Sequence, residues 1–590
     1  MGKGASLGPS PNPCPREGKD IVTTNTQGRV QISLMKRDPA LYLALVTVWL
    51  SFAIFIFLPL IRLLGTTFIT DGRLSLVNLK TIWSKRYNIK ALYGSLILAT
   101  SVSVAGTFLG YLFALAVTRT QISRFFKGLL SVVAMLPLIS PPFTSSISLT
   151  LALGPNGMLL KAMGIGNFSI YGFLGTWISE TLTYFPVAFM VITAVLQTMS
   201  ATLDDAALSL GASRWRMFRT LTVPLSLPAI VNSILLLFGA SLADFATPLI
   251  LGGHTFPVLP TEAYLLITGM FDLKGGATMS FLLLVPALIV FFLQRLMLGK
   301  KSFVSVTGKS GSRTEFARLP RSLKAIMLVV ISVVSVFILY LYAIILWGSF
   351  VKVWSVNNTF TWEHYRYVFR HGKKAITDTL LIAFLSTVIG SILAVIIGYV
   401  VQRKQFFGRR FLEFSSMLNY ALPGTVVGIA YIIAFNSKPF LLTGTLAILV
   451  AAYVFRYYAT GIRSVIASLE QIDPALEEAS LSLGAGSVYT FTHVTIPLII
   501  PALVSGMRYL FIHCMTAISA TIFLVSVHWS LLTTRILESM TELQFSQASA
   551  FSIVLIAIVF LADILLMYLL KFTTATFYRT QEIQYENIGA

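Results

Sequence analysis

Two short polar stretches of this chain carry the same residue types at the same spacing. In the first, an acidic pair and two alanines precede Gly211, and Pro224 follows. In the second, Gly484 and Pro497 each lie 273 residues after their counterparts. Such a repeat indicates two similar units in one chain. The repeated residues are Asp204, Asp205, Ala206, Ala207, Gly211 and Pro224, and then Glu477, Glu478, Ala479, Ser480, Gly484 and Pro497.

These residues indicate a docking surface rather than a catalytic site. Carboxylates suit the first turn of a helix because of the helix dipole, the glycines permit a turn or a close backbone approach, and the prolines suit the start of the following helix. No convergent catalytic set accompanies the acids, and we expect no catalytic residue. We interpret 203–224 (the first loop) and 476–497 (the second loop) as helix–glycine–helix units that another protein grips. The alternative is an ordinary loop between two membrane spans.

Composition identifies a polytopic membrane protein. The 590 residues are 56% hydrophobic and only 11% charged, and the mean hydropathy is +0.81, which is far too apolar for a soluble protein of this size. The net charge is +21, but the basic residues are scattered between apolar segments. They therefore favour topology signals and lipid headgroup contacts over a nucleic-acid partner. The two cysteines, Cys14 and Cys514, indicate neither a disulfide scaffold nor a metal site.

Apolar segments of about 20 to 30 residues predict twelve transmembrane helices and an all-α fold. Six spans precede a basic linker and six follow it, so both halves enter the membrane in the same sense and form parallel repeats. No cleavable signal sequence precedes the first span, which we expect to be an uncleaved anchor. The predicted spans are 41–64, 92–118, 128–152, 172–196, 224–251, 278–297, 324–349, 376–401, 411–435, 444–467, 497–526 and 548–570. The predicted divisions are a disordered tail at 1–40, a first half at 41–297, a linker at 298–323, a second half at 324–570 and a tail at 571–590.

Lysines and arginines in the short loops predict the orientation. One side of the membrane holds most of them and is therefore cytoplasmic. That side includes both loops, the linker and both termini. Two longer basic loops on the opposite side, just before spans two and eight, depart from the rule and are a further copy of the repeat. The cytoplasmic cations are Arg119, Arg124, Lys127, Arg214, Arg216, Arg219, Arg403, Lys404, Arg409, Arg410 and those of the linker.

Both loops resemble a motif of a known transporter family. The pattern from Asp205 to Pro224 and from Glu478 to Pro497 is similar to the EAA loop of permease subunits in binding-protein-dependent ABC importers. Asp205 stands where the family has glutamate, and Ser480 where it has a second alanine. The resemblance implies a type I ABC importer permease fold, in which each loop is a coupling helix docked on an ATP-hydrolysing subunit. Two such loops in one chain resemble the fused permeases, best known among ferric iron importers.

The resemblance also implies the partners. Two copies of an ABC ATPase would bind ATP and Mg on the cytoplasmic side, and one substrate-binding protein would dock outside a bacterial cytoplasmic (inner) membrane. This chain would then be no enzyme and would hold no cofactor and no metal. Its string nearest to a phosphate-binding loop, 307–310, lacks the upstream glycine, because Phe303 stands there. No dense cluster of His, Cys and carboxylates suggests a metal site.

Few ionisable residues lie within the predicted spans, where they are expensive and usually face the bundle interior. We expect structural charge pairs, for example between Asp244 and an arginine; a place on the translocation path is the alternative. Prolines 137, 141 and 142, and Pro423 with Gly424, interrupt spans three and nine, where we expect neighbouring helices or a cavity to satisfy the freed carbonyls. The embedded residues are Glu180, Asp244, Arg456, Arg508, His513 and Asp563, and the candidates for the path or for charge pairs are Asp244, Arg456, Arg508 and His513.

The substrate that the resemblance implies is ferric iron. The segments 238–253 and 515–526 look most like those of ferric iron permeases, while relatives with similar patterns import phosphonates, thiamine, polyamines or sulfate. Two other classes stay open. A secondary transporter with two six-span halves would need coupling ionisable groups at the midplane, and a membrane-embedded enzyme or assembly factor would need a catalytic set.

Overall fold

The computed structural model describes residues 39–155, 157–165, 168–199, 201–298 and 320–588. The predicted tail at 1–40 and the linker at 298–323 therefore fall almost wholly outside the described residues. Within those residues the regular secondary structure is helical apart from two small hairpins, β1 (Ile69–Thr70) with β2 (Arg73–Leu74) and β3 (Val351–Val353) with β4 (Asn357–Phe360), and one isolated bridge. The predicted all-α membrane fold is confirmed.

Helices stand at the positions of all twelve predicted spans. Among the described helices, nine are long and apolar enough to cross a membrane, and two bent pairs add up to two more. The twelfth, α20, is less apolar because Arg456 and Arg463 lie within it, so the count of twelve is not confirmed by apolarity. The first half contains α2 (Pro39–Phe52) continued by η1 (Ala53–Phe57) and α3 (Leu58–Phe68), α5 (Arg86–Arg119), α6 (Arg124–Ile139) with α7 (Thr144–Leu153), α9 (Phe173–Thr198), α12 (Val223–Leu242) and α14 (Leu273–Leu298). The second contains α15 (Arg321–Gly348), α17 (Lys373–Arg403), α18 (Arg409–Ala421) with α19 (Gly424–Phe435), α20 (Leu446–Gln471), α23 (Ile496–Thr516) and α26 (Phe545–Ile588).

Spans five and eleven are shorter than predicted. The sequence predicts continuous helices to 251 and 526, but α12 ends at Leu242 and α23 ends at Thr516. Irregular backbone follows in both halves, before the short helices η3 (Pro248–Gly252) and α24 (Thr521–Leu524). Apolar composition alone extended the prediction, whereas the helical backbone ends in a turn at Ala243 and Asp244 in the first half and becomes extended at Ala517 in the second.

Spans three and nine are sharply broken where the prolines stand. The angle is 103° between α6 and the helical segment Thr144–Ala162, which begins with α7, and 105° between α18 and α19. The freed carbonyls find partners on the next span: the Thr183 hydroxyl donates to Pro142 O at 3.2 Å, and the Arg456 guanidinium donates to Leu422 O at 2.9 Å. Thr183 and Arg456 are themselves 273 residues apart. The expectation that neighbouring helices satisfy these carbonyls is confirmed.

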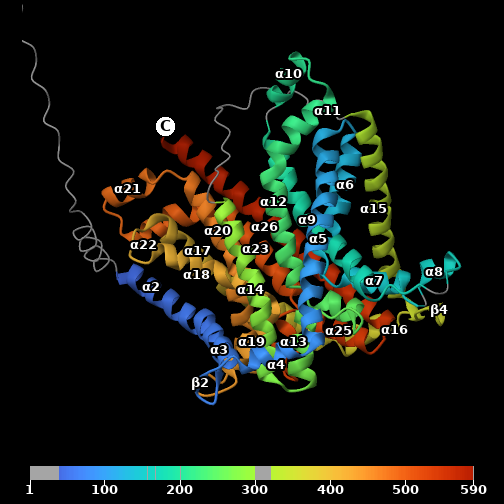
Figure 1. Cartoon of the computed structure of the whole chain (residues 1–590). Helices are drawn as coiled ribbons and strands as arrows, with labels where there is room; N and C mark the ends of the chain where they lie inside the picture. Colours follow the sequence, from blue (N-terminus) through green and yellow to red (C-terminus); the bar gives the residue numbers. More distant parts are fainter. Residues whose placement is uncertain (1–38, 156, 166–167, 200, 299–319, 589–590) are drawn as a thin grey trace, which may run out of the picture.

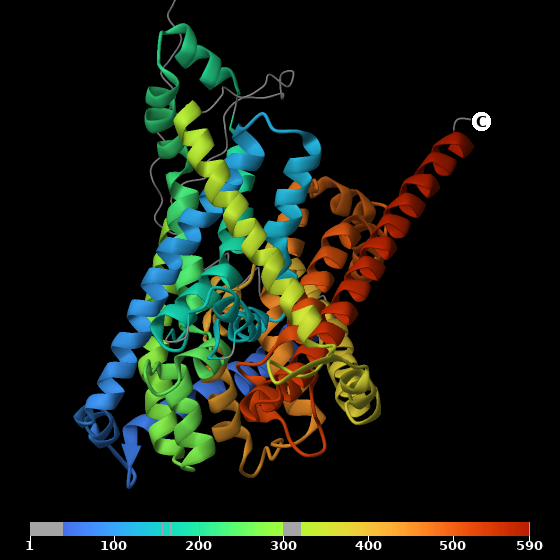
Figure 2. The same cartoon turned by 90° about the vertical axis from the view of Figure 1, so that its right-hand side faces the viewer.

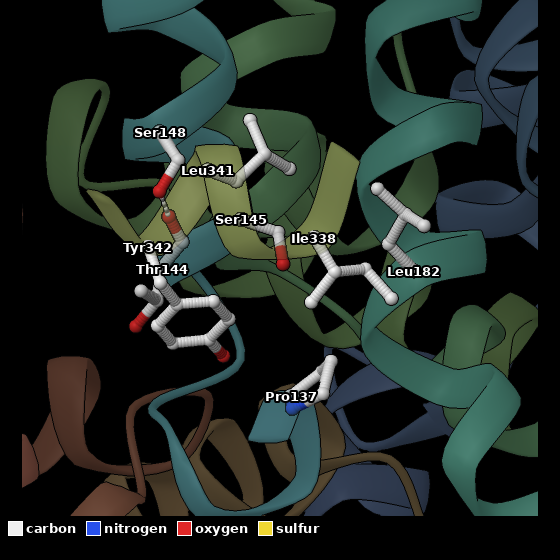
Figure 3. A pocket seen from close by; sticks show the side chains of 8 residues that line it. All are labelled: Pro137, Thr144, Ser145, Ser148, Leu182, Ile338, Leu341 and Tyr342. Atoms are coloured by element: carbon white, nitrogen blue, oxygen red, sulfur yellow. Dashed lines mark hydrogen bonds between the residues drawn. The ribbon is translucent and has the colours of Figure 1, made fainter. Parts of the chain in front are cut away.

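A small cavity of about 10 Å³ lies beside the break in span three. Figure 3 shows its mixed lining: polar side chains of Thr144, Ser145, Ser148 and Tyr342, and apolar side chains of Pro137, Leu182, Ile338 and Leu341. A space of this size holds about one water molecule.

The first span of each half packs against the opposite half. The rod from α2 to α3 contacts α19 and α20, and α15 contacts α5, α6 and α7. Figures 1 and 2 show α15 lying along the first half, beside α6. The halves are thus joined by an exchange of outer helices as well as by their central contact between α14 and α19.

Glycines allow the inner helices of each half to approach closely. A Cβ on Gly110 of α5 would lie 2.7 Å from the backbone nitrogen of Phe189 in α9. In the second half, a Cβ on Gly506 would lie 3.0 Å from the Cα of Gly461. Small residues at helix crossings are typical of membrane bundles, where close packing replaces the hydrophobic effect as the driving force.

The polar elements are divided between two ends of the molecule. Figure 1 shows the helices of the first and second loops toward the upper and upper-left side, which we call the loop end. At the opposite end lie two similar modules, each a hairpin followed by a short helix: β1–β2 with α4 (Val77–Ser84), and β3–β4 with α16 (Glu363–Arg370). These modules are the two basic loops that the sequence marks as a further copy of the repeat.

Candidate functional site

The first and second loops fold alike, with a glycine at the turn between two short helices. Gly211 and Gly484 adopt φ values of +77° and +89°, which L-residues other than glycine rarely adopt. Among the described residues, a Cβ at either position would meet nothing within 4 Å. Within this chain the glycines therefore form a turn, and a close backbone approach by a partner stays a prediction. The helices are α10 (Ala201–Ser209) and α11 (Arg214–Met217) in the first loop, and α21 (Ala475–Ser482) and α22 (Ser487–Thr490) in the second.

A buried ion pair, the first clamp, ties the first loop to α5. Asp204, the first acid of its pair, binds the guanidinium of Arg119, the last residue of α5. The two side chains are only 3% and 2% exposed. Arg119 also contacts the Met199 sulfur at 3.1 Å. A pair so thoroughly removed from water holds its geometry firmly, because either charge alone would be costly to bury.

The second clamp repeats this arrangement in the other half. Arg403, the last residue of α17, donates from Nε to Glu477 Oε1 at 3.1 Å, and its Nη2 donates to Ile472 O at 2.8 Å. The Thr495 hydroxyl at 3.2 Å and the Tyr399 hydroxyl at 3.3 Å also donate to Glu477. The first acid of each pair is therefore an inward-facing support that fixes its loop on the second span of the same half.

The rest of each loop faces outward. The second acids, Asp205 and Glu478, are exposed. Leu210 and Leu483, directly before the glycines, are 88% and 89% exposed. Further apolar side chains on the same loops are exposed, namely Leu203, Leu208, Trp215, Leu476, Leu481, Val488 and Tyr489. Apolar groups gathered on a protruding polar loop are typical of a protein interaction site.

The second short helices of the two loops differ in sequence and in their exposed side chains. In the first loop Trp215 lies against Phe218, with ring centroids 5.8 Å apart, between the exposed Arg214 and Arg216. In the second, Tyr489 stacks on His493 at 4.1 Å. The two surfaces thus share the leucines and the second acid but not the cationic residues.

One embedded pair is structural, as expected. Arg508 of α23 binds Asp563 of α26 through two hydrogen bonds of 2.8 and 2.9 Å. This bidentate pair neutralises both charges where the last span of the second half packs on its fifth.

The expected pairing of Asp244 with an arginine is wrong. Asp244 instead accepts from the Tyr184 hydroxyl at 3.0 Å and from the Thr247 amide at 3.3 Å. The Arg456 guanidinium donates hydrogen bonds to Leu422 O and, at 3.3 Å, to the Tyr457 hydroxyl. His513 lies between Tyr509 and Tyr457, with ring centroids 3.9 and 5.6 Å away. Across the described residues, no group of three or more His, Cys, Asp and Glu side chains is placed to hold a metal ion.

Sequence reasoning missed the supporting arginines. From the sequence, Arg119 and Arg403 were interpreted only as orientation signals, because a positive charge at the end of a span is expected on the cytoplasmic side whatever it contacts. The available signal was their shared place in the repeat: each ends the second span of its half, and the same half later contains a loop that starts with two adjacent acidic residues.

Comparison with known proteins places both loops within one family. The model of the family described as "binding-protein-dependent transport system inner membrane component" matches twice, at residues 106–301 and 386–574. Each match contains one loop. Because together they cover more than half of the chain, the match concerns the architecture of both halves.

Full-length relatives are similar along most of the chain. The "ferric transport system permease protein FbpB" of Actinobacillus pleuropneumoniae is 33% identical over 539 residues, covering 90% of this chain and 78% of the relative. The "putative ferric transport system permease protein FbpB 1" of Haemophilus influenzae is 34% identical over 512 residues, covering 85% and 80%. Among solved structures, a bacterial ABC transporter involved in alginate import is 21% identical with a TM-score of 0.40, covering 46% of this chain and 99% of that one.

Proposed function

This chain belongs to the family of binding-protein-dependent transport system inner membrane components, and on this premise we propose that it is the fused permease of an ATP-driven importer of ferric iron. The first and second loops are its coupling loops. The duplicated clamp carries this proposal: in each half a buried ion pair fixes a loop that presents a protruding leucine, Leu210 or Leu483, at the same end of the molecule. An apolar side chain on a rigid support is a suitable anchor for a protein partner.

The proposed partners follow from this division of the molecule. Two copies of an ABC ATPase dock at the cytoplasmic side, one on each loop, and there bind ATP and Mg. A substrate-binding protein docks at the opposite end, over the hairpin modules. Both chain termini lie on the cytoplasmic side. The permease itself supplies the path and no catalytic group.

In the proposed mechanism, ATP-driven closure of the ATPases draws the two loops together. Arg119 and Arg403 pass this movement to α5 and α17, because each clamp joins its loop to the end of a long helix. The halves then rock as rigid bodies and open the central path alternately to either side. Gly211 and Gly484 keep the turn that aims each leucine at its partner.

Ferric iron is the substrate best supported. Two relatives with ferric transport in their names are similar over most of their own length. In addition, Glu180 and Asp244 are buried acids of the first half that form no ion pair within the described part of the chain. Buried carboxylates suit the passage of a cation and oppose that of an oxyanion.

The test is uptake of radiolabelled ferric iron by cells with and without the gene, with ATP depleted in a parallel sample. We expect uptake that requires both the gene and ATP. Uptake that survives ATP depletion would instead favour a secondary transporter. If iron uptake does not depend on the gene but uptake of molybdate, phosphonate, thiamine, polyamine or sulfate does, the chain is still an importer permease but iron is not its substrate.

A further inference from the structure

The break in span five of the first half brings several oxygen-bearing side chains together. After α12 ends at Leu242, the chain turns through 243–246 before η3 begins. Asp244 lies in this turn, and Ser241 lies one turn earlier on α12. Glu180 and Tyr184, four residues apart on one face of α9, lie against them. The cluster is near the end of α12 that is remote from the loops.

Hydrogen bonds inside the cluster leave one carboxylate oxygen without a partner. The Tyr184 hydroxyl donates to Asp244 Oδ2 at 3.0 Å, and the Ser241 hydroxyl donates to Glu180 Oε2. Glu180 Oε1 is buried and has no hydrogen-bond partner among the described residues, and the whole residue is 0% exposed. Buried polar atoms are almost always satisfied, so this oxygen indicates a missing ligand or proton.

Charge in the cluster is also uncompensated. Glu180 and Asp244 interact electrostatically with one another, and neither forms an ion pair among the residues that the structure describes. Arg456 of the second half is close enough to act on Tyr184, but its guanidinium donates to Leu422 O and to Tyr457. Two neighbouring buried carboxylates cannot both stay ionised unless a cation lies between them.

The repeat shows that this cluster is not part of the common scaffold. The positions 273 residues later hold Tyr453, Tyr457, Cys514 and Ala517, with no carboxylate. Tyr453 there hydrogen-bonds Thr521 within its own half. The equivalent part of the second half is built without acids, so the repeated fold does not by itself account for the acids of the first half.

We propose that Glu180, Asp244 and Ser241 form a transient binding station for a hard, multivalent cation on its way through the permease. The proposal rests on the proposed function and assigns the place at which the ferric ion enters the membrane path. Carboxylate and hydroxyl oxygens are the ligands that hard cations prefer. Tyr184 is a positioning residue that orients Asp244. Since Glu180 is fully buried and Asp244 is 4% exposed, the station is closed in this conformation and opens only when the halves move.

The first experiment measures transport and hydrolysis together. The complex of permease, ATPase and iron-loaded binding protein is reconstituted in proteoliposomes with Glu180→Gln, Asp244→Asn or the control Tyr453→Phe, which alters the equivalent position of the second half. We expect each acid variant to lower ferric uptake per ATP about tenfold, because ligand charge sets cation affinity, while the binding protein still stimulates ATP hydrolysis. The control should change uptake less than about twofold. Unchanged uptake in both acid variants, or loss of the ATPase stimulation as well, would overturn the station.

The second experiment detects the station by cation binding instead of uptake. Terbium(III), a hard trivalent ion whose luminescence is sensitised by a nearby tyrosine, is added to the same complex during ATP hydrolysis, because the station opens only when the halves move. We expect a saturable signal that falls in Glu180→Gln, Asp244→Asn and Tyr184→Phe but not in Tyr453→Phe. Equal signals in all variants would mean that the acids share a proton and hold no cation. If wild-type permease moves no iron but this pattern is seen, the proposed substrate fails and the cation station stands.

Discussion

Replacing Glu477 by glutamine removes the charge of the second clamp while keeping the shape of the side chain. Glu477 accepts hydrogen bonds from Arg403, Thr495 and Tyr399, and the side chains of the ion pair are 9% and 13% exposed. Hydrogen bonds to charged groups contribute about 1.5–3 kcal/mol. Because glutamine keeps one acceptor oxygen, we expect the second loop to lose about 1–2 kcal/mol of its free energy of local opening. That corresponds to an opening equilibrium about 5- to 30-fold larger.

Hydrogen exchange of the backbone amides in 475–490 measures this opening directly. The permease is studied without ATPase, so that docking does not mask the loop. Glu478→Gln is the matched control, since it makes the same chemical change one residue away on an exposed side chain. Exchange in the control should stay within about twofold of wild type, because exposed charges contribute little.

Two outcomes would refute this reasoning. Equal acceleration by Glu477→Gln and Glu478→Gln would show that the charge of the loop matters and the clamp does not. No acceleration by Glu477→Gln would show that the second loop is held by its backbone alone. Asp204→Asn in the first loop should accelerate exchange at least as much as Glu477→Gln, because the first clamp is more deeply buried.

Three further predictions address the turn, the docking face and the embedded pair. Gly484→Ala should lower the free energy of unfolding by about 1 kcal/mol, because alanine is strained at the observed φ. The control Gly486→Ala, at a negative φ and in open space, should leave thermal unfolding unchanged. Equal effects of the two substitutions would contradict a role for the turn. Glu478→Lys and Leu483→Asp should each reduce co-purification of the ATPase while the chain stays inserted, and full retention would remove these side chains from the interface. Arg508→Met should lower the amount of folded permease, since the part-buried Asp563 loses its partner at a cost of about 1–3 kcal/mol. Adding Asp563→Leu should restore it; failure of that rescue would mean that Arg508 has a role beyond the pair.

The loops and the spans were predictable because both depend on local patterns. A span is recognised by its apolar length alone, and the loops by two copies of one spacing, Gly211 to Pro224 and Gly484 to Pro497. The broken spans were also foreseeable, since prolines mark them and a lipid environment requires that freed carbonyls find partners.

Contacts between distant residues were not predictable. Nothing local distinguishes Arg119, which binds Asp204 85 residues later, from a cation that only sets orientation. The pairing of Asp244 was wrongly predicted because an arginine is the usual partner of a buried acid, while the turn after Leu242 placed Tyr184 within reach instead. The predicted ends of spans five and eleven were wrong for a related reason. Composition gives the apolar length of a segment but not the residue at which its backbone turns.

The exchanged outer helices have a consequence for how the protein is made. The first half is synthesised before α15, yet α15 covers its helices α5, α6 and α7. A nascent chain that has inserted only the first six spans therefore exposes a surface on α5, α6 and α7 that α15 later covers, and α3 likewise lacks its contact with α19. Neither half is a finished folding unit by itself. A chain divided between α14 and α15 should then give two fragments that find each other in the bilayer, and either fragment expressed alone should be removed by membrane proteases.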